Sequence, residues 1–197
     1  EELDEAIEIA AEIGYPVIVK ATAGGGGKGM RVAHNVAALR TAVTAAQQEA
    51  IASFGNGAVY LEKFLDQARH IEVQVLGDKH GNAVHLFNRD CTSQRRHQKL
   101  IEEGPAPGVD AEIRNQVCES AAELIRKANY SGAATVEFLM NKKQEFFMLE
   151  VNTRVQVEHP VSEMITGVDI VKESIRVAAG EKLSWTQDEI QLKGHAI

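Results

Sequence analysis

The sequence predicts an α+β fold, in which helices pack on sheets of mostly antiparallel strands. Residues 70–76 alternate polar and apolar side chains, and a short apolar segment at 84–87 follows a turn, which is the pattern of a hairpin. A second pair of strands is expected at 133–140 and 145–151. Because helical segments separate these hairpins, the pattern favours α+β over a doubly wound parallel sheet.

The first 64 residues are expected to form a small lobe. Leu3, Ile7 and Ala10 recur at helical spacing, and Gly14 with Pro16 ends this first helix. The elements expected here are a helix at 1–13, a strand at 17–20, an extended segment at 30–32, an Ala-rich helix at 37–49 and a strand at 59–62.

Residues 65–197 are expected to form a larger lobe that contains both hairpins. Helices are predicted at 110–128, with Asp110 as the N-cap, and at about 169–179. The polar stretch 89–103 is assigned to neither helix nor strand. Because the chain starts at a glutamate and ends in what resembles an interrupted strand, we expect the middle piece of a longer protein.

The composition makes several function classes unfavourable. With 44% hydrophobic and 25% charged residues, the chain has enough apolar material for a folded core. Its 21 Lys and Arg residues against 28 Asp and Glu residues give a net charge of −7, opposite to that of most duplex nucleic-acid binders. No apolar run approaches the roughly 20 residues that span a bilayer. Cys91 and Cys118 form no CxxC pair, so we expect no zinc site and a reduced, cytoplasmic protein.

A glycine-rich loop at 24–29 contains Lys28 and follows Lys20. Successive glycines let backbone N–H groups surround phosphate oxygens, because no Cβ blocks the approach. A dinucleotide fingerprint would open a helix, whereas residues 30–32 look extended, and a P-loop lysine would be followed by Ser or Thr. We therefore expect a phosphate-binding flap, with a plain mobile hairpin as the alternative.

Two acidic residues lie on the strands of the second hairpin. With the turn at 141–144, Glu137 is expected opposite Met148, and Glu150 diagonally beside it on the same face as Asn152. Two carboxylates and an amide oxygen suit Mg²⁺ or Mn²⁺. A register slip of one residue would place Glu150 on the other face, and two solvated acids are the alternative interpretation.

The segment after these strands continues to alternate polar and apolar residues. Arg154, Gln156 and Glu158 are then expected on the face that carries Glu150. A guanidinium binds a planar oxyanion with two hydrogen bonds, and a nearby carboxylate could accept a proton from that oxyanion. An Arg–Glu salt bridge on a polar sheet face is the alternative.

A basic stretch at 89–99 is interpreted as a site for an anionic small molecule, with a solvated basic loop as the alternative. No aromatic residues interleave with the basic ones, which disfavours a nucleic-acid surface. Cys91 is expected to be a packed residue rather than a nucleophile. Asp66 and Glu72 are expected to be surface or structural residues.

Six motifs of this sequence resemble those of the biotin carboxylases, which are ATP-grasp enzymes found alone or within acetyl-CoA, propionyl-CoA, methylcrotonyl-CoA and pyruvate carboxylases. The resemblance covers essentially the whole chain and implies an ATP-grasp fold with a small lid lobe and a larger antiparallel-sheet lobe. The motifs are KATAGGGGKGM at 20–30, EKFL at 62–65, RHIEVQ at 69–74, RDC at 89–91, QRRHQK at 94–99 and EVNTRVQVEHP at 150–160.

The resemblance also implies the role of individual residues. ATP contacts are implied for Lys20, Gly26, Gly27, Met30, Glu62, Lys63, Leu65, His70, Gln94, His97 and Leu139. Divalent cations, Mg²⁺ or Mn²⁺, are implied at Glu137, Glu150 and Asn152. Bicarbonate contacts are implied for Lys99, Arg154, Gln156, Val157 and Glu158. Lys99, Arg154 and Glu158 are the implied catalytic residues, and Glu158 would remove the proton of bicarbonate.

The implied reaction is ATP-dependent carboxylation of biotin through carboxyphosphate. The implied partners are a biotin carboxyl carrier protein or domain and a carboxyltransferase subunit or domain, in a parent that forms a homo-oligomer. A eukaryotic parent would be mitochondrial. The family carries further domains before and after these residues, so the chain alone is expected to be weakly active or inactive. The competing interpretations are another ATP-grasp enzyme, either a carboxylate-amine ligase or a carbamoyl-phosphate-type synthetase, and a non-catalytic ATP-binding or regulatory module.

Overall fold

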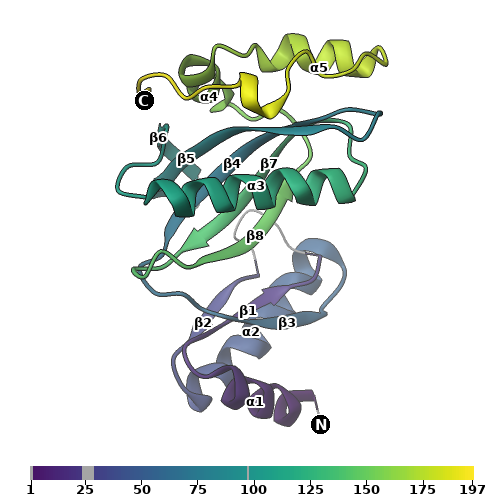
Figure 1. The fold of residues 1–197 in the computed structure, drawn as a ribbon. Coiled ribbons are helices and arrows are strands. Elements are labelled where there is room, and N and C mark those ends of the chain that lie inside the picture. Colours follow the sequence, from purple (N-terminus) through teal and green to yellow (C-terminus); the bar gives the residue numbers. More distant parts are fainter. Residues whose placement is uncertain (1, 24–28, 97) are drawn as a thin grey trace. The chain divides into compact units, whose positions relative to one another are not determined.

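A computed structural model describes residues 2–23, 29–96 and 98–197. The chain divides into two compact units, Glu1–Asp66 and Gln67–Ile197, which are considered separately below (Figure 1). The lobe boundary expected between residues 64 and 65 lies next to this division. In the described part of the chain, no helix combines the length and the apolar character needed to cross a membrane.

The first unit is a three-stranded antiparallel sheet with two helices packed on it. Its strand order is β2-β1-β3, and buried residues such as Val17, Val19 and Leu39 form its core. Its elements are α1 (Glu2–Ile13), β1 (Val17–Ala21), β2 (Arg31–Ala33), α2 (Val36–Phe54) and β3 (Val59–Lys63).

Helix α2 is longer than the predicted 37–49 because both of its ends have capping residues. The Asn35 side chain accepts a hydrogen bond from the Ala38 backbone N–H at 2.9 Å, which satisfies a free donor of the first turn. At the other end, Gly55 takes a left-handed conformation with φ 71° and its N–H bonds to the Ile51 carbonyl. The helix therefore continues to Gly55, because glycine adopts this left-handed conformation without the steric cost that other residues have.

The second unit is built on a five-stranded antiparallel sheet of order β6-β5-β4-β7-β8. Helix α3 starts after Asp110, whose side chain accepts a hydrogen bond from the Glu112 N–H, as the N-cap prediction required. The elements are β4 (Arg69–Gly77), β5 (Ala83–Arg95), β6 (Gln98–Glu103), α3 (Ala111–Lys127), β7 (Gly132–Met140), β8 (Phe146–Asn152), α4 (His159–Thr166), α5 (Ile170–Ala178) and a 3₁₀ turn at Gln187–Glu189.

Helices cover both faces of this sheet (Figure 1). Helix α3 packs on one face over Val73, Val75 and Val136, whereas the other face carries Leu76 and Leu86 beneath the segment that contains α4 and α5. The alternation at 70–76 had predicted one core face and one polar face. Glu72 and Gln74, two of the polar side chains of β4, are in fact fully buried, because a second layer of helix covers this face.

The polar stretch 89–103 forms strands, which the sequence analysis did not assign. It supplies the end of β5, a turn and the edge strand β6. Arg96 takes a left-handed conformation with φ 53° at this turn. The pairing contains register shifts between Asp90 and Ser93 and between Ser93 and Gln94, so no regular alternation marks the strands in the sequence.

Candidate functional site

Two bulges determine which charged side chains share a face of the five-stranded sheet. In β4 and β5 the register shifts after Val73, where Phe87 has a φ of 61°, so that Glu72 lies opposite Arg89. Without this shift Asn88 would be the partner of Glu72, and Arg89 would point toward α3. Bulges are frequent beside functional sites because they re-aim side chains.

The second bulge corrects the predicted pairing of β7 with β8. Phe138 pairs with Met148, but the register then shifts and Glu137 lies directly opposite Glu150. The expectation that Glu137 faces Met148 with Glu150 on the diagonal was therefore wrong. The extra residue, Leu149, keeps both carboxylates on one face although the turn is one residue longer than predicted.

Lys99, on β6, lies at the centre of three carboxylates. Its Nζ atom is 2.8 Å from Glu137 Oε1 and 2.6 Å from Glu158 Oε1, and it also forms an ion pair with Glu72. Burial alone would lower the pKa of Lys99, but the charge of Glu72 and the hydrogen bonds to all three carboxylates outweigh burial and raise it. Lys99 therefore stays positively charged at neutral pH.

Sequence reasoning missed the role of Glu72 and Arg89. Both side chains are fully buried, and Arg89 Nε donates to Glu72 Oε1 at 2.6 Å. Glu72 is not a surface residue, and Arg89 is not part of a solvated basic loop. For Glu72 the signal that could have found it is a charged residue between the apolar Ile71 and Val73, because a buried charge requires a partner. Arg89 lies between Asn88 and Asp90, so its neighbours in the sequence give no such signal.

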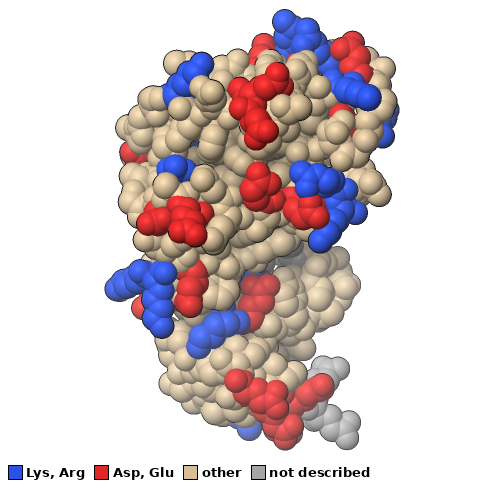
Figure 2. All heavy atoms as spheres, in the orientation of Figure 1, with Lys and Arg blue, Asp and Glu red and all other residues tan. Residues whose placement is uncertain are grey.

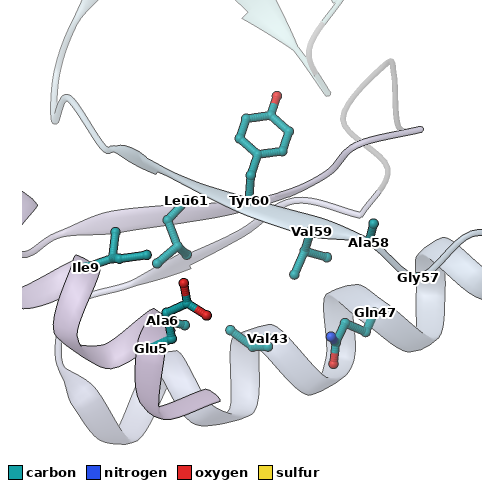
Figure 3. A pocket seen from close by; sticks show the side chains of 10 residues that line it. All are labelled: Glu5, Ala6, Ile9, Val43, Gln47, Gly57, Ala58, Val59, Tyr60 and Leu61. Carbon is teal, nitrogen blue, oxygen red and sulfur yellow. The ribbon is translucent and has the colours of Figure 1, made fainter. Parts of the chain in front are cut away.

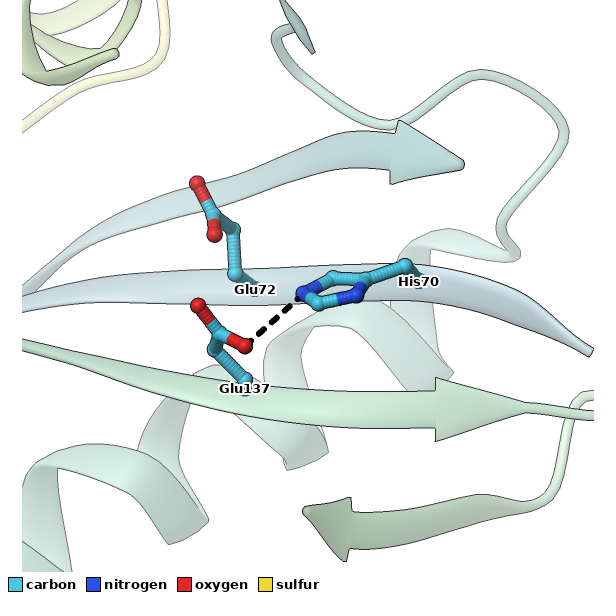
Figure 4. Close-up of side chains that lie close together, drawn as sticks. All are labelled: His70, Glu72 and Glu137. Carbon is cyan, nitrogen blue, oxygen red and sulfur yellow. Dashed lines mark ion pairs between the residues drawn. The ribbon is translucent and has the colours of Figure 1, made fainter. Parts of the chain in front are cut away.

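Glu137 connects the Lys99 cluster to His70. Its Oε2 atom lies 3.1 Å from His70 Nε2, and the side chains of His70, Glu72 and Glu137 project from neighbouring strands to one side of the sheet (Figure 4). Its Oε1 atom also accepts from Asn152 Nδ2 at 3.0 Å and from Gln156 Nε2 at 3.2 Å. Burial would raise the pKa of Glu137, but the contacts with His70 and Lys99 outweigh burial and lower it to about 2.

The residues predicted to bind a divalent cation lie together. Asn152 Nδ2 is 3.0 Å from Glu137 Oε1 and 3.4 Å from Glu150 Oε1, and the Glu150 side chain is exposed. Two carboxylates and an amide form a hard donor set that fits Mg²⁺ or Mn²⁺. A second group, Glu72 with Cys91 and Glu158, is also compact, but burial and the Glu72 charge raise the pKa of the Cys91 thiol and disfavour a thiolate ligand.

The segment after β8 does not continue the strand, although its alternation was expected to place Arg154, Gln156 and Glu158 on the face of Glu150. Strand β8 ends at Asn152, and residues 153–158 form an irregular connection to α4. The site residues nevertheless remain near the cluster: Arg154 Nη2 donates to Asn152 Oδ1 at 3.2 Å, and Gln156 contacts Glu137. Val157 is 93% exposed, and Glu158 is only 7% exposed. Pro160, in the first turn of α4, is the helix-start signal that was overlooked.

Three residues that were predicted to contact ATP lie on neighbouring strands: Gln94 on β5, His70 on β4 and Leu139 on β7. Gln94 Nε2 is 3.1 Å from His70 Nδ1 and donates to the Cys91 carbonyl at 2.8 Å, and Leu139 pairs with His70 in the sheet. Cys91 is fully buried, as expected of a packed residue.

The first unit contains five further residues that were predicted to contact ATP: Lys20, Met30, Glu62, Lys63 and Leu65. Lys20 forms an ion pair with Glu62, and Lys63 Nζ donates to the carbonyls of Gly14 and Tyr15 at 2.8 and 3.0 Å. Met30 and Leu65 are half-buried. Gly26, Gly27 and His97, also predicted to contact ATP, lie outside the described residues.

A cavity of about 710 Å³ opens on the first unit between α1, α2 and β3 (Figure 3). Its lining includes Ile9, Val43, Val59 and Leu61, and none of the residues predicted to bind ATP lines it. On the face of the molecule drawn in Figure 2, acidic and basic side chains lie interspersed. Neither the cavity nor the surface charge identifies the predicted site. The site is identified by the buried carboxylates around Lys99.

The model of the family described as carbamoyl-phosphate synthase L chain, ATP binding domain, matches residues 1–186. The chain belongs to this family. It is 56% identical over 191 residues to a biotin carboxylase of Allochromatium vinosum, with 97% of this chain and 42% of the relative covered. It is 55% identical over 189 residues to the mitochondrial methylcrotonoyl-CoA carboxylase subunit alpha of Rattus norvegicus, covering 96% of this chain and 26% of the relative.

A solved structure shares the fold with a TM-score of 0.93 at 48% identity, over 98% of this chain and 43% of that one. It is the biotin carboxylase domain dimer of the Hydrogenobacter thermophilus 2-oxoglutarate carboxylase, in complex with MgADP, ADP and bicarbonate. The predicted resemblance to biotin carboxylases and the ATP-grasp fold are thereby confirmed. The chain spans less than half the length of these relatives.

Proposed function

We propose that this chain supplies the ATP, metal and bicarbonate sites of a biotin carboxylase, an ADP-forming ligase. The observation that carries the proposal is the half-buried ammonium of Lys99, which is bound by the buried carboxylates of Glu72, Glu137 and Glu158 next to Gln156. Bicarbonate is an oxyanion that must lose a proton in this reaction. It therefore requires a fixed, positively charged hydrogen-bond donor next to a carboxylate that acts as the base.

In the proposed reaction, an oxygen of bicarbonate forms a bond to the γ-phosphorus of ATP, and the bond to the β-phosphate oxygen breaks. The products are ADP and carboxyphosphate, which releases CO₂ and phosphate. CO₂ then bonds to the ureido nitrogen of biotin, whose N–H proton passes to the released phosphate. Glu158 takes the bicarbonate proton. Lys99 and Arg154 bind the anion with Gln156, and Val157 contributes through its backbone because its side chain is apolar.

Glu137, Glu150 and Asn152 are the proposed ligands of Mg²⁺ or Mn²⁺. Their oxygen donors suit either ion, and the bound ion would offset negative charge on the phosphates. Asn152 donates its amide N–H groups to both carboxylates, so ligation through its oxygen requires the amide to turn.

We assign the proposed nucleotide contacts residue by residue. Lys20 and the flap residues Gly26, Gly27 and Met30 are assigned to the phosphates and their enclosure. Glu62, Lys63, Leu65 and Leu139 are assigned to adenine, and His70, Gln94 and His97 to the rest of the nucleotide pocket. The ion pair of Lys20 with Glu62 keeps the ammonium in place on β1.

The partners and location follow from the same proposal. A biotin carboxyl carrier and a carboxyltransferase would complete the reaction cycle, and the parent would be a homo-oligomer. We expect a cytoplasmic protein, or a mitochondrial one in a eukaryote. The chain by itself is expected to bind nucleotide but to carboxylate biotin poorly, because it spans only part of its relatives.

The test is a carboxylation assay with the full-length protein, MgATP, free biotin and isotopically labelled bicarbonate. The expected result is acid-labile label on biotin, formed together with ADP. ATP binding without label on biotin would contradict the proposal and favour another ATP-grasp ligase, for which a screen of amine acceptors would follow.

A further inference from the structure

Behind Lys99, a chain of buried polar side chains extends away from the proposed bicarbonate residues. Glu72 uses its two oxygens for different cations: Oε2 binds Lys99, and Oε1 accepts from Arg89 Nε at 2.6 Å. Glu72 and Arg89 are both fully buried. Glu72 therefore links the ammonium of Lys99 to a guanidinium that has no exposed surface.

Arg89 is held in turn by two further side chains. Its Nη1 donates to Gln74 Oε1 at 3.0 Å and to the hydroxyl of Ser162 at 2.7 Å, and Ser162 is also fully buried. Ser162 lies in α4, one helical turn after Glu158. Because Glu158 binds Lys99, these contacts and the backbone of the first turn of α4 together close a ring through Ser162, Arg89, Glu72, Lys99 and Glu158.

Stability alone is a poor explanation for this ring. The cost of removing two ions from water offsets most of the attraction within a buried ion pair. Arg89 Nη2 is moreover buried with no hydrogen-bond partner among the described residues. What the ring does provide is a fixed position for groups at its other end, since residues behind a site commonly set the orientation of those in it.

We propose that Arg89 and Ser162 are positioning residues, which hold Glu72 and thereby align Lys99 with Glu158 for bicarbonate. This inference rests on the proposed function. Neither residue contacts substrate. Ser162 fixes the first turn of α4 against the sheet, and Arg89 holds the Glu72 carboxylate so that its second oxygen stays on Lys99.

The test uses Ser162→Ala in the full-length protein, because it keeps the charge of Arg89. The expected result is a loss of about tenfold in kcat/KM for bicarbonate, with KM for MgATP unchanged. Ser174→Ala is the matched control, because Ser174 lies in α5 and its hydroxyl donates to the Ile170 carbonyl at 2.8 Å, with no further hydrogen bond among the described residues. It is expected to behave like the wild type.

Two further variants separate positioning from packing. Ser162→Thr keeps the hydroxyl and is expected to restore most of the rate. Ser162→Cys keeps the side-chain volume but replaces the hydroxyl with a poor hydrogen-bond acceptor. It is therefore expected to lose kcat/KM for bicarbonate as the alanine variant does. Because it leaves no cavity, it tests the hydrogen bond even where Ser162→Ala does not fold.

Equal bicarbonate kcat/KM for Ser162→Cys, Ser174→Ala and the wild type would overturn the inference. A fall in kcat with the KM for bicarbonate and the KM for MgATP both unchanged would also overturn it, because that is what a general loss of folded protein gives. A wild-type protein that makes no carboxybiotin would instead contradict the proposed function.

Discussion

The two faces of the five-stranded sheet are both buried, but different forces hold them. On the face beneath α3, valines such as Val73, Val75 and Val136 pack against helix side chains. On the opposite face, Glu72, Arg89 and their partners replace much of that apolar contact with ion pairs. Apolar burial stabilises the fold with little demand on geometry, whereas buried ions require matched partners at fixed positions. The charged face is therefore the one suited to a site.

The largest effect on stability is expected from Lys99→Met. The change leaves Glu72, Glu137 and Glu158 close together without the ammonium that binds them. Breaking a buried ion cluster from one side costs roughly 3–5 kcal/mol of unfolding free energy. Urea denaturation measures this cost, and Lys142→Met, in an exposed turn, is the control. Equal urea midpoints for the two variants would show that the ion pairs of Lys99 do not hold the charged face together.

A smaller, pH-dependent effect is expected from His85, which lies on the α3 side of β5. Burial lowers the pKa of His85 to about 4, so the folded protein favours the neutral ring. The unfolded chain takes up a proton near pH 6.5, so this contribution is complete above pH 6.5 and is lost as the pH falls toward 4. We expect a decrease of about 3 kcal/mol in unfolding free energy over that range.

Denaturant titrations between pH 7 and pH 4 measure this slope. His85→Leu should reduce it, whereas His34→Leu, at an exposed position of the first unit, should leave it unchanged. A slope that persists in His85→Leu would show that the acid sensitivity arises elsewhere, for example at the carboxylates of the charged face.

The smallest effect is expected from Val73→Ala, within the apolar face. Val73 is fully buried, and removing its two methyl groups should cost about 2 kcal/mol through lost burial and a small cavity. Kinetic constants of the remaining folded protein should not change, because no site residue loses a partner. A selective rise in KM for bicarbonate would show that the two faces are coupled.

The sequence predicts those parts of the fold that depend on local interactions. The helix at 110–128 and its Asp110 cap are confirmed, as are both hairpins, because capping and alternation act between residues close in the chain. Glu137, Glu150 and Asn152 were likewise expected on one face and are found there.

The features that escaped prediction depend on distant parts of the chain. The bulge in β5 requires a left-handed backbone conformation at Phe87. Phenylalanine rarely adopts this conformation, so the sequence gives no sign of the bulge. The burial of Glu72 depends on α4 and α5, which lie about 90 residues later in the sequence. Alternation in one strand cannot show whether its polar face will be covered.

The most direct test of the account compares Glu158→Gln with Glu181→Gln in the carboxylation assay of the full-length protein. Glu158 binds the Lys99 ammonium, whereas Glu181 is an exposed residue after α5. Loss of the proposed base should lower the rate of label transfer to biotin by roughly 10²–10⁴-fold, with MgATP binding retained, while Glu181→Gln keeps the full rate. Wild-type label transfer in Glu158→Gln would contradict the assignment of the base and the placement of bicarbonate at Lys99.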